Sequence, residues 1–367
     1  MIRLLIVDDS PLMRRLLGRV FTAEGDFEIA FARDGAEALD QVAAFEPDVI
    51  TLDIHMPGMD GLTCLDRIML MRPCPVVMVS SLTEAGAGVT LQALELGAVD
   101  FITKPERAVS LEIDTLAPKL VEKVRSAARA RLRGSLRLTE RVRLRSGLGS
   151  PESVPVPRKR ASAPLLKRTI KAAPAPGLVL IGTSTGGPPA LDAVLSRLPA
   201  GFPWPIVVAQ HMPGTFTGPL ARRLDKLCAL TVVEAAYPMP LAPGHVYIGK
   251  GDADVIISVR AGGPVVMAAP SLPEHRWHPS VDRLVESAMQ HLEADRLIGV
   301  LMTGMGNDGT RSMMLLKEQG GRTIAEAEET AVVWGMPGEL VRSGGAQVIA
   351  PLELIAERIM DLVEGSP

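Results

Sequence analysis

The sequence has few aromatic residues, few cysteines and no long apolar run. Aromatic side chains make up 3% of the 367 residues, so the core must be aliphatic and rich in the 17 methionines. The three cysteines lack metal-ligand spacing and are odd in number, which favours reduced structural thiols. No segment approaches the roughly 18 apolar residues of a membrane span, and the start is too briefly apolar for a signal peptide. We therefore expect a cytoplasmic protein that is not embedded in a membrane.

Charge is unevenly distributed along the chain. The formal net charge is −3, yet residues 119–171 hold sixteen Lys and Arg against three Glu, a local net charge of +13. From residue 150 onward Pro, Ala, Ser and Lys dominate, a composition that does not build a core. A chain of this length is expected to form two domains. We predict one domain over residues 1–125, a basic Pro/Ala-rich linker over 126–176 and a second domain over 177–367.

The basic linker allows several interpretations. Residues 125–145 have helical propensity, so we expect an extended helix that gives way to a flexible tether. The charge belongs either to a solvated segment or to an electrostatic contact with an acidic partner or an acidic face of the same protein. DNA binding is the remaining alternative, but no helix-turn-helix pattern accompanies the basic residues. We expect no nucleic-acid partner.

The first domain alternates short apolar runs with amphipathic segments. Residues 3–7, 49–52, 76–79 and 101–103 are predicted strands, and a closing helix is predicted from residue 111 to about 133. Ser10 and Pro11 have the residue types of an N-cap and a first helical position. Such alternation indicates a doubly wound parallel sheet. In such sheets, ligands bind beyond the carboxyl ends of the strands.

Polar residues follow the predicted strands and should converge at one edge of the sheet: Asp8, Asp9, Asp53, Ser80 and Lys104. Three carboxylates together repel one another, so the cluster favours a hard cation such as Mg²⁺. Lys104 and the cation would neutralise an incoming phosphoryl group, which makes Asp53 a plausible nucleophile. Ser80 would bind the phosphoryl oxygens. Any one of these aspartates alone could be a helix cap, but together they predict a phosphate-accepting site.

These residues resemble the receiver domain of two-component response regulators, over residues 1 to about 120, through the motifs Val-Asp8-Asp9-Ser, Asp53-Ile-His-Met-Pro-Gly, Val-Ser80-Ser and Lys104-Pro105. The resemblance implies a flavodoxin-like fold. It implies phosphotransfer from a histidine kinase to Asp53, with Mg²⁺ held by Asp8, Asp9 and Asp53. It further implies switch roles for Ser80, Phe101 and Lys104, and a cis peptide bond before Pro105.

Three predicted strands of the second domain lead into polar or glycine-rich segments. Residues 178–181 precede Gly-Thr-Ser184-Thr-Gly-Gly, residues 206–209 precede Gln-His211-Met-Pro, and residues 297–302 precede Thr-Gly-Met-Gly-Asn-Asp308-Gly. A serine on a tight strand-to-helix turn is exposed, and the helix N-terminus favours an oxyanion beside it. Taken alone, the glycine-rich turn fits a phosphate-binding loop equally well.

The three segments can meet at one rim of a sheet. His211 would then take the proton of Ser184, and Asp308 would hold the imidazole in the useful tautomer. A lone histidine there is more often structural, and Asp308 alone could simply shape a turn. Together the three residues favour a Ser/His/Asp hydrolase. No Cys/His/Glu cluster with metal spacing accompanies them, so we expect no cofactor in this domain.

The second domain is similar to the catalytic domain of the chemotaxis protein-glutamate methylesterases, over residues 178 to about 365. Besides the three motifs above, Pro-Gly-His245-Val-Tyr-Ile and Gly335-Met336-Pro337 carry this similarity. It implies a Rossmann-like domain that hydrolyses glutamate γ-methyl esters on the cytoplasmic domains of methyl-accepting chemotaxis receptors and deamidates certain receptor glutamines.

The same similarity implies the roles of individual residues. Ser184 would be the nucleophile, His211 the general base and Asp308 its orienting carboxylate. The backbone amides of Thr185 and Met305 would stabilise the oxyanion. One segment departs from the family pattern: the usual His-Arg-Pro-Ser-Val-Asp is here Trp277-His278-Pro279-Ser280-Val281-Asp282. The substrate contacts of this segment are therefore open.

We interpret the chain as a two-domain α/β protein, with two doubly wound parallel sheets and a receiver that regulates a serine esterase. Phosphorylation would shift Ser80 and Phe101 and expose a cleft that the receiver otherwise hinders. Two alternatives stay open. The triad could act on a different ester or amide, or the second domain could be a non-enzymatic, partner-binding output domain.

Overall fold

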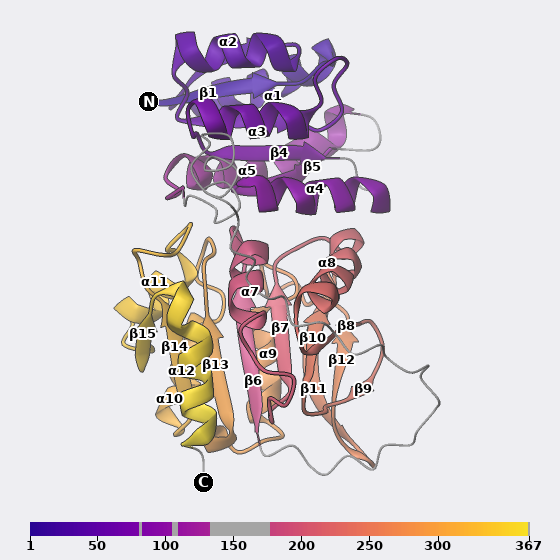
Figure 1. Cartoon of the computed structure of the whole chain (residues 1–367), viewed down its shortest axis with the longest axis vertical. Helices are drawn as coiled ribbons and strands as arrows, with labels where there is room; N and C mark the ends of the chain where they lie inside the picture. Colours follow the sequence, from indigo (N-terminus) through magenta and orange to yellow (C-terminus); the bar gives the residue numbers. More distant parts are fainter. Residues whose placement is uncertain (81–82, 105–108, 133–176, 366–367) are drawn as a thin grey trace, which may run out of the picture. The chain divides into compact units, whose positions relative to one another are not determined.

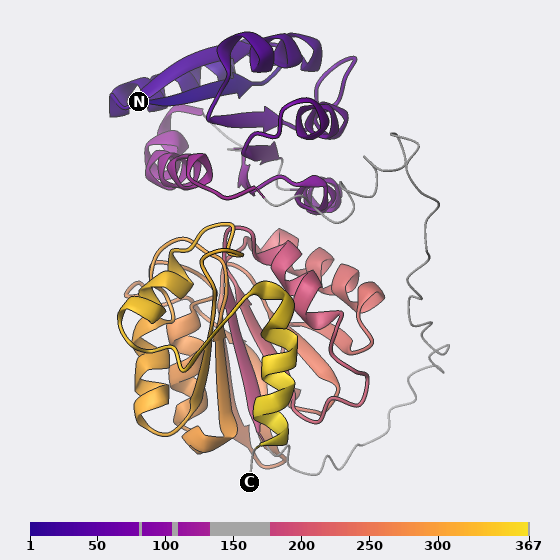
Figure 2. The ribbon, with the colours of Figure 1, turned by 60° about the vertical axis from the view of Figure 1, so that its left-hand side comes forward.

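The computed structural model describes residues 1–80, 83–104, 109–132 and 177–365. It divides the chain into two compact units, Met1–Ser150 and Pro151–Pro367, which are described separately below (Figure 1, Figure 2). Most of the predicted linker, residues 133–176, lies outside the described residues. The predicted domain boundaries therefore stay predictions, as does the role of the basic segment.

The first unit is a parallel sheet with the strand order β2-β1-β3-β4-β5. This is the flavodoxin-like order, in which the chain reverses direction between β1 and β3. Its central strands are buried on both faces, which explains their continuous apolar runs. The elements are β1 (Ile2–Val7), α1 (Pro11–Glu24), β2 (Phe27–Ala32), α2 (Gly35–Phe45), β3 (Val49–Asp53), α3 (Gly61–Met71), β4 (Val76–Ser80), α4 (Glu84–Leu96), β5 (Asp100–Thr103) and α5 (Val109–Ala128).

Local signals set the helix ends of this unit. Ser10 caps α1, because its side chain accepts a hydrogen bond from the amide of Met13, and Pro11 is the first helical residue as predicted. The closing helix α5 is shorter than predicted and ends at Ala128 instead of about residue 133. The amides of Arg129 and Ala130 donate to carbonyls only three residues back, which tightens the last turn and ends the helix.

The second unit is built on a seven-stranded parallel sheet with the order β15-β14-β13-β6-β7-β10-β8. A small antiparallel sheet, β11-β12-β9, which was not among the predicted elements, accompanies it. The strands are β6 (Leu178–Thr183), β7 (Ile206–Gln210), β8 (Thr231–Ala235), β9 (Met239–Pro240), β10 (His245–Gly249), β11 (Asp254–Arg260), β12 (Gly263–Ala269), β13 (Leu297–Leu301), β14 (Arg322–Glu326) and β15 (Val348–Ala350).

Helices cover both faces of the seven-stranded sheet. In Figure 1, α7 and α12 lie in front of it and α9 behind it. The helices are α7 (Gly187–Leu195), α8 (Gly214–Leu227), α9 (Val281–Met289), α10 (Thr310–Glu318), α11 (Met336–Arg342) and α12 (Leu352–Glu364), with a short 3-10 turn at Ala294–Arg296. Among the described residues, no helix is both long and apolar enough to cross a membrane.

The middle of this sheet is its topological switch point. From β6 the chain first adds β7 on one side, and only later returns to add β13 on the other side. Connections leaving the carboxyl ends of β6 and β13 therefore diverge, which is where ligands bind in open sheets of this kind. Strands β13, β6 and β7 are adjacent and fully buried. They are the three strands whose ends carry the predicted nucleophile, base and orienting carboxylate.

Candidate functional sites

The first unit gathers charged side chains at the carboxyl edge of its sheet. Asp8 follows β1, Asp53 ends β3 and Lys104 follows β5. The Lys104 Nζ lies 3.0 Å from Asp8 Oδ2 and 2.8 Å from Asp53 Oδ2. One carboxylate oxygen from each of Asp8, Asp9 and Asp53 lies within 4.8 Å of the others. The structure thus brings together the four charged residues that the sequence placed at three strand ends.

The Asp53 side chain of this pocket is buried close to that of Asp8, which disfavours its charged form. Burial raises the pKa of Asp53 above its usual value, and the nearby Asp8 raises it further. Lys104 acts to lower this pKa but does not outweigh burial. Burial acts to lower the pKa of Lys104, but its contacts with Asp53 and Asp8 outweigh it and raise that pKa. Three carboxylates against one ammonium leave a net negative pocket lined with oxygen donors. These donors fit a hard divalent cation such as Mg²⁺.

The predicted switch residues lie beside this pocket. Ser80 is buried at the end of β4, and its hydroxyl is hydrogen-bonded to Thr90 Oγ1 of α4 at 2.7 Å. The Lys104 amide donates to the Ser80 carbonyl at 2.7 Å. Phe101 is buried in β5, with the Lys123 ammonium 5.3 Å from its ring centroid. Pro105 lies outside the described residues, so the cis bond stays a prediction.

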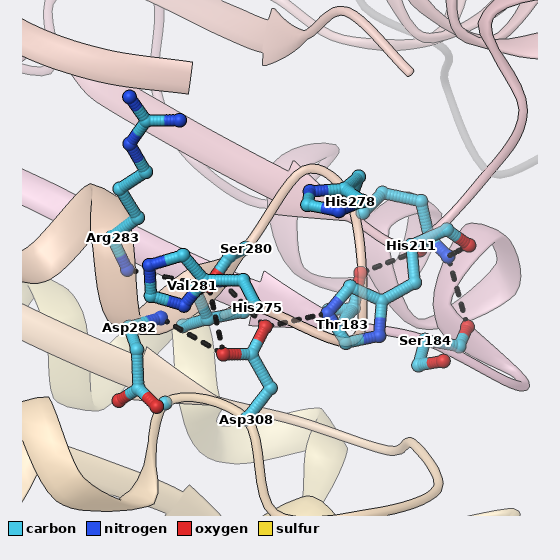
Figure 3. A network of polar contacts seen from close by, with 12 residues as sticks. Thr183, Ser184, His211, His275, His278, Ser280, Val281, Asp282, Arg283 and Asp308 are labelled. Atoms are coloured by element: carbon cyan, nitrogen blue, oxygen red, sulfur yellow. Dashed lines mark hydrogen bonds and ion pairs between the residues drawn. The ribbon is translucent and has the colours of Figure 1, made fainter. Parts of the chain in front are cut away.

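In the second unit, Ser184 and His211 directly follow β6 and β7, and Asp308 lies in the loop between β13 and α10. The His211 Nε2 is 2.8 Å from Asp308 Oδ2. The other ring nitrogen, Nδ1, is buried and has no hydrogen-bond partner among the described residues. Figure 3 shows the imidazole between Asp308 and Ser184, with this second nitrogen turned toward the serine. The arrangement leaves Nδ1 available to a proton from Ser184.

Asp308 is bound by the N-terminus of α9. The amides of Val281 and Asp282 donate to its two carboxylate oxygens at 2.7 and 3.1 Å, and the Ser280 hydroxyl donates at 3.0 Å. Burial would raise the pKa of Asp308, but the hydrogen bond and charge of His211 and these amides outweigh it and hold the pKa below its usual range. A carboxylate at a helix N-terminus is further favoured by the helix dipole. Asp308 therefore stays ionised.

Two buried side chains that the sequence did not single out hold the site loops in place. Gln210 accepts from the Thr183 hydroxyl at 2.5 Å and donates to the carbonyls of Ser184 and His211 at 3.0 and 3.1 Å. Thr303 donates to the Thr185 carbonyl at 2.9 Å. Both residues sit directly at strand ends next to catalytic motifs, which is the signal that could have identified them.

The loop that carries Met305 packs directly on the serine. A Cβ atom added to Gly304 would lie only 2.7 Å from the Ser184 Cβ, so no larger residue fits there. Met336 belongs to the Gly335-Met336-Pro337 segment noted in the sequence. Its amide donates a hydrogen bond to the Gly304 carbonyl at 2.9 Å. Thr185 and Met305 are thus the chain neighbours of Ser184 and Gly304, the two residues at which the loops come closest. By contrast, His245 begins β10 at the amino edge of the sheet and is not brought to this site.

The segment that departs from the family pattern lies at the centre of the site. Ser280 is the N-cap of α9 and contacts Asp308, while Trp277 stacks on His211. His278 Nδ1 is 2.8 Å from Asp254 Oδ1. The peptide bond between His278 and Pro279 is cis.

Comparisons with known proteins agree with this arrangement. A family model for CheB methylesterase matches residues 179–359, and one for the response regulator receiver domain matches residues 4–113. A protein-glutamate methylesterase/protein-glutamine glutaminase of Rhodopseudomonas palustris (strain BisB18) is 58% identical over 363 residues, 98% of each chain. One of Rhodospirillum rubrum is 55% identical over 359 residues, covering 98% of this chain and 95% of the relative.

A solved structure is also similar. The CheB methylesterase catalytic domain of Thermotoga maritima is 40% identical, with a TM-score of 0.49, and the match covers 51% of this chain and 98% of that domain. The near-complete coverage of the relatives from R. palustris and R. rubrum includes both units of the chain. The chain therefore belongs to the family of protein-glutamate methylesterases/protein-glutamine glutaminases, with a response regulator receiver domain preceding a CheB methylesterase domain.

Proposed function

We propose that this protein hydrolyses glutamate γ-methyl esters, and deamidates glutamines, on the cytoplasmic domains of chemoreceptors, under the control of phosphorylation at Asp53. The observation that carries the esterase is the arrangement of Ser184, His211 and an ionised Asp308 at the carboxyl edge of three adjacent strands. Because receptor and kinase act in the cytoplasm in this scheme, we propose that the protein acts there too.

In the first half of the reaction, the Ser184 Oγ attacks the ester carbonyl carbon while its proton moves to His211 Nδ1. Asp308, bound to Nε2, holds the ring in the tautomer that leaves Nδ1 free, and stabilises the imidazolium that forms. The carbonyl oxygen becomes an oxyanion, for which we propose the amides of Thr185 and Met305 as donors. The carbon–oxygen bond then breaks, and His211 returns its proton to the leaving methoxide as methanol departs.

In the second half, a water molecule attacks the acyl-serine carbonyl and gives its proton to His211 Nδ1. Collapse of this intermediate releases the glutamate carboxyl group, which loses the second water proton to solvent, and the proton on His211 passes to the Ser184 Oγ. A glutamine side chain follows the same path, with ammonia leaving in place of methanol. The lowered pKa of Asp308 matters in both halves, because a protonated carboxyl would not balance the imidazolium.

In the receiver, we propose that the Asp53 carboxylate accepts a phosphoryl group from a histidine kinase. Mg²⁺ held by Asp8, Asp9 and Asp53 would neutralise negative charge in the pocket. Lys104 and the Ser80 hydroxyl would contact the phosphoryl oxygens. To reach them, Ser80 must leave Thr90, and this shift would weaken the hindrance of the esterase by the receiver.

The test is methanol release from methylated receptor, with and without a small-molecule phosphodonor and Mg²⁺. Wild type, Ser184→Ala and Asp53→Ala are compared. We expect Ser184→Ala to lose release altogether, and Asp53→Ala to lose only the stimulation. Deleting residues 1–140 should raise basal release. Release that survives in Ser184→Ala would disprove the esterase, and a deletion that leaves basal release unchanged or lowers it would disprove hindrance by the receiver.

A further inference from the structure

Trp277 contacts the general base directly. Its indole lies parallel to the His211 imidazole, with 3° between the ring planes and 5.9 Å between the centroids. This is the geometry of an offset aromatic stack. The hydrogen bond from His211 to Asp308 fixes one ring nitrogen but leaves the ring able to tilt about that bond. A flat partner against the imidazole removes this freedom, because tilting would separate the two planes.

The same indole also touches the loop that follows β13. A Cβ atom added to Gly306 would lie 2.6 Å from Trp277 Cζ2, so the six-membered ring rests against the Gly306 backbone. Gly306 directly follows Met305, whose amide is a proposed oxyanion donor. One side chain therefore contacts both the base and the loop expected to stabilise the oxyanion.

The loop that carries Trp277 is held from both sides. The Arg276 guanidinium lies 5.1 Å from the indole centroid. On the other side, the fully buried Asp254 binds His278, the Ser280 amide and Arg283. Burial would raise the pKa of Asp254, but these three contacts outweigh it and lower that pKa, so the anchor is a charged carboxylate. Trp277 thus stands on a fixed support.

We propose that Trp277 is a positioning residue for the esterase. It fixes the plane of the His211 ring so that Nδ1 faces Ser184. Its π-face also stabilises the imidazolium formed when His211 accepts the serine proton, since a cation within about 6 Å of an indole centroid is attracted to it. This inference rests on the proposed roles of Ser184 and His211. It also assigns a role to Trp277, one of the residues that depart from the family pattern.

The test compares methanol release by Trp277→Leu, Trp277→Phe and wild type, each over a range of receptor concentrations. We expect Trp277→Leu to lower kcat about tenfold and to leave KM within about twofold, because the effect acts on the transition state and not on substrate binding. Trp277→Phe, which keeps a flat ring, should restore kcat to within about threefold of wild type. Trp204→Phe, a buried indole at the opposite edge of the sheet beside Gly177, should match wild type.

The outcomes separate this inference from the proposed function. Wild type that releases no methanol would overturn the proposed function, and this inference with it. Wild type that releases methanol would leave only the inference at stake. It would be overturned by an unchanged kcat in Trp277→Leu, by equal losses in the leucine and phenylalanine variants, or by a raised KM with kcat intact. Circular dichroism checks folding, and Trp277→Met replaces Trp277→Leu if the latter does not fold.

Discussion

Asp53 of the receiver and Asp308 of the catalytic unit occupy matching places in two sheets, yet their surroundings differ. Asp53 ends β3 and Asp308 lies in the loop that follows β13, each beside a switch point, and each is at least 96% buried. Asp53 faces another carboxylate and a lysine, and burial raises its pKa. Asp308 receives two amides, a hydroxyl and an imidazole, and its pKa is lowered despite burial.

The difference fits the two proposed roles, in which Asp53 reacts and Asp308 orients. Asp53 has fewer donors, one amide from His55 and the Lys104 ammonium, so a cation would stabilise its charge and its oxygen can act as a nucleophile toward phosphorus. Asp308 has all its charge satisfied by fixed donors, so it is a poor nucleophile and a good support for an imidazolium. The sheet determines where a functional aspartate stands, and the neighbouring loops determine what it does.

The largest effect should come from neutralising the orienting carboxylate. Asp308→Asn keeps the shape but presents an amide to His211 Nε2, which favours the wrong tautomer, so we expect kcat for methanol release to fall about 10³–10⁴-fold. Asp53→Asn should leave basal release within about twofold and abolish only the phosphodonor response. Asp295→Asn, an exposed aspartate just before β13, is the control. A loss below tenfold in Asp308→Asn would contradict the role given to this residue.

A smaller loss should follow from removing one donor to Asp308. Ser280→Ala deletes the hydroxyl that donates to Oδ1 at 3.0 Å. Hydrogen bonds to charged groups contribute about 1.5–3 kcal/mol, so kcat should fall about 10- to 100-fold. Ser280→Thr keeps the hydroxyl and should recover most of the rate. Ser287→Ala, in the same helix but bonded to Ile257 and Leu284, should have the wild-type rate; an equal loss there would mean that helix stability, not Asp308, is responsible.

Much of this arrangement could be predicted from the sequence, for one physical reason. Buried parallel strands appear as continuous apolar runs, and a polar residue that ends such a run must lie at the carboxyl edge. This rule was enough to place Asp8, Asp53, Ser184 and His211, and it put the loop that carries Asp308 at the same edge. It worked in both units, because β3, β6, β7, β13 and the last four residues of β1 are buried.

The donors around these residues were less predictable. Ser280 and Trp277 approach the triad from a loop that precedes a helix, and the distance along the chain from Ser280 to Asp308 is 28 residues. No periodicity encodes such a contact, since it depends on the tertiary path of the loop. The antiparallel strands β11 and β12 were missed because neither is a continuous buried run and neither leads into a motif of the predicted site. The end of α5 at Ala128 was missed because helix boundaries depend on local capping bonds.

The opposite pKa directions predict opposite effects on stability. The folded pKa of Asp53 is above its unfolded value of about 3.9, so its charge destabilises the receiver at neutral pH and costs nothing below that value. Without divalent cation, Asp53→Asn should therefore stabilise the receiver by on the order of 1 kcal/mol at pH 7, a gain that vanishes near pH 4. Asp308→Asn should destabilise its unit at pH 7, and this deficit should close as pH falls through the lowered folded pKa. Hydrogen exchange of β3 and β13 as a function of pH measures the stability of each unit in variant and wild type. Stability changes of the same sign in the two variants at pH 7 would contradict the comparison.

The smallest effect concerns how readily the receiver responds. Ser80 is hydrogen-bonded to Thr90, which also bonds the Gly86 carbonyl in its own helix at 2.8 Å. Thr90→Val keeps the shape but removes the hydroxyl, so Ser80 no longer breaks a hydrogen bond of about 0.5–1.5 kcal/mol when it turns to the phosphoryl group. Half-maximal stimulation of methanol release should then need about threefold less phosphodonor, with the same maximum. Thr90→Ser should respond like wild type. A Thr90→Val variant that needs more phosphodonor would show that this hydrogen bond stabilises the activated receiver. The hydrogen bond to Thr90 would then not hold Ser80 in its resting position, whereas the donors around Asp308 do hold that carboxylate.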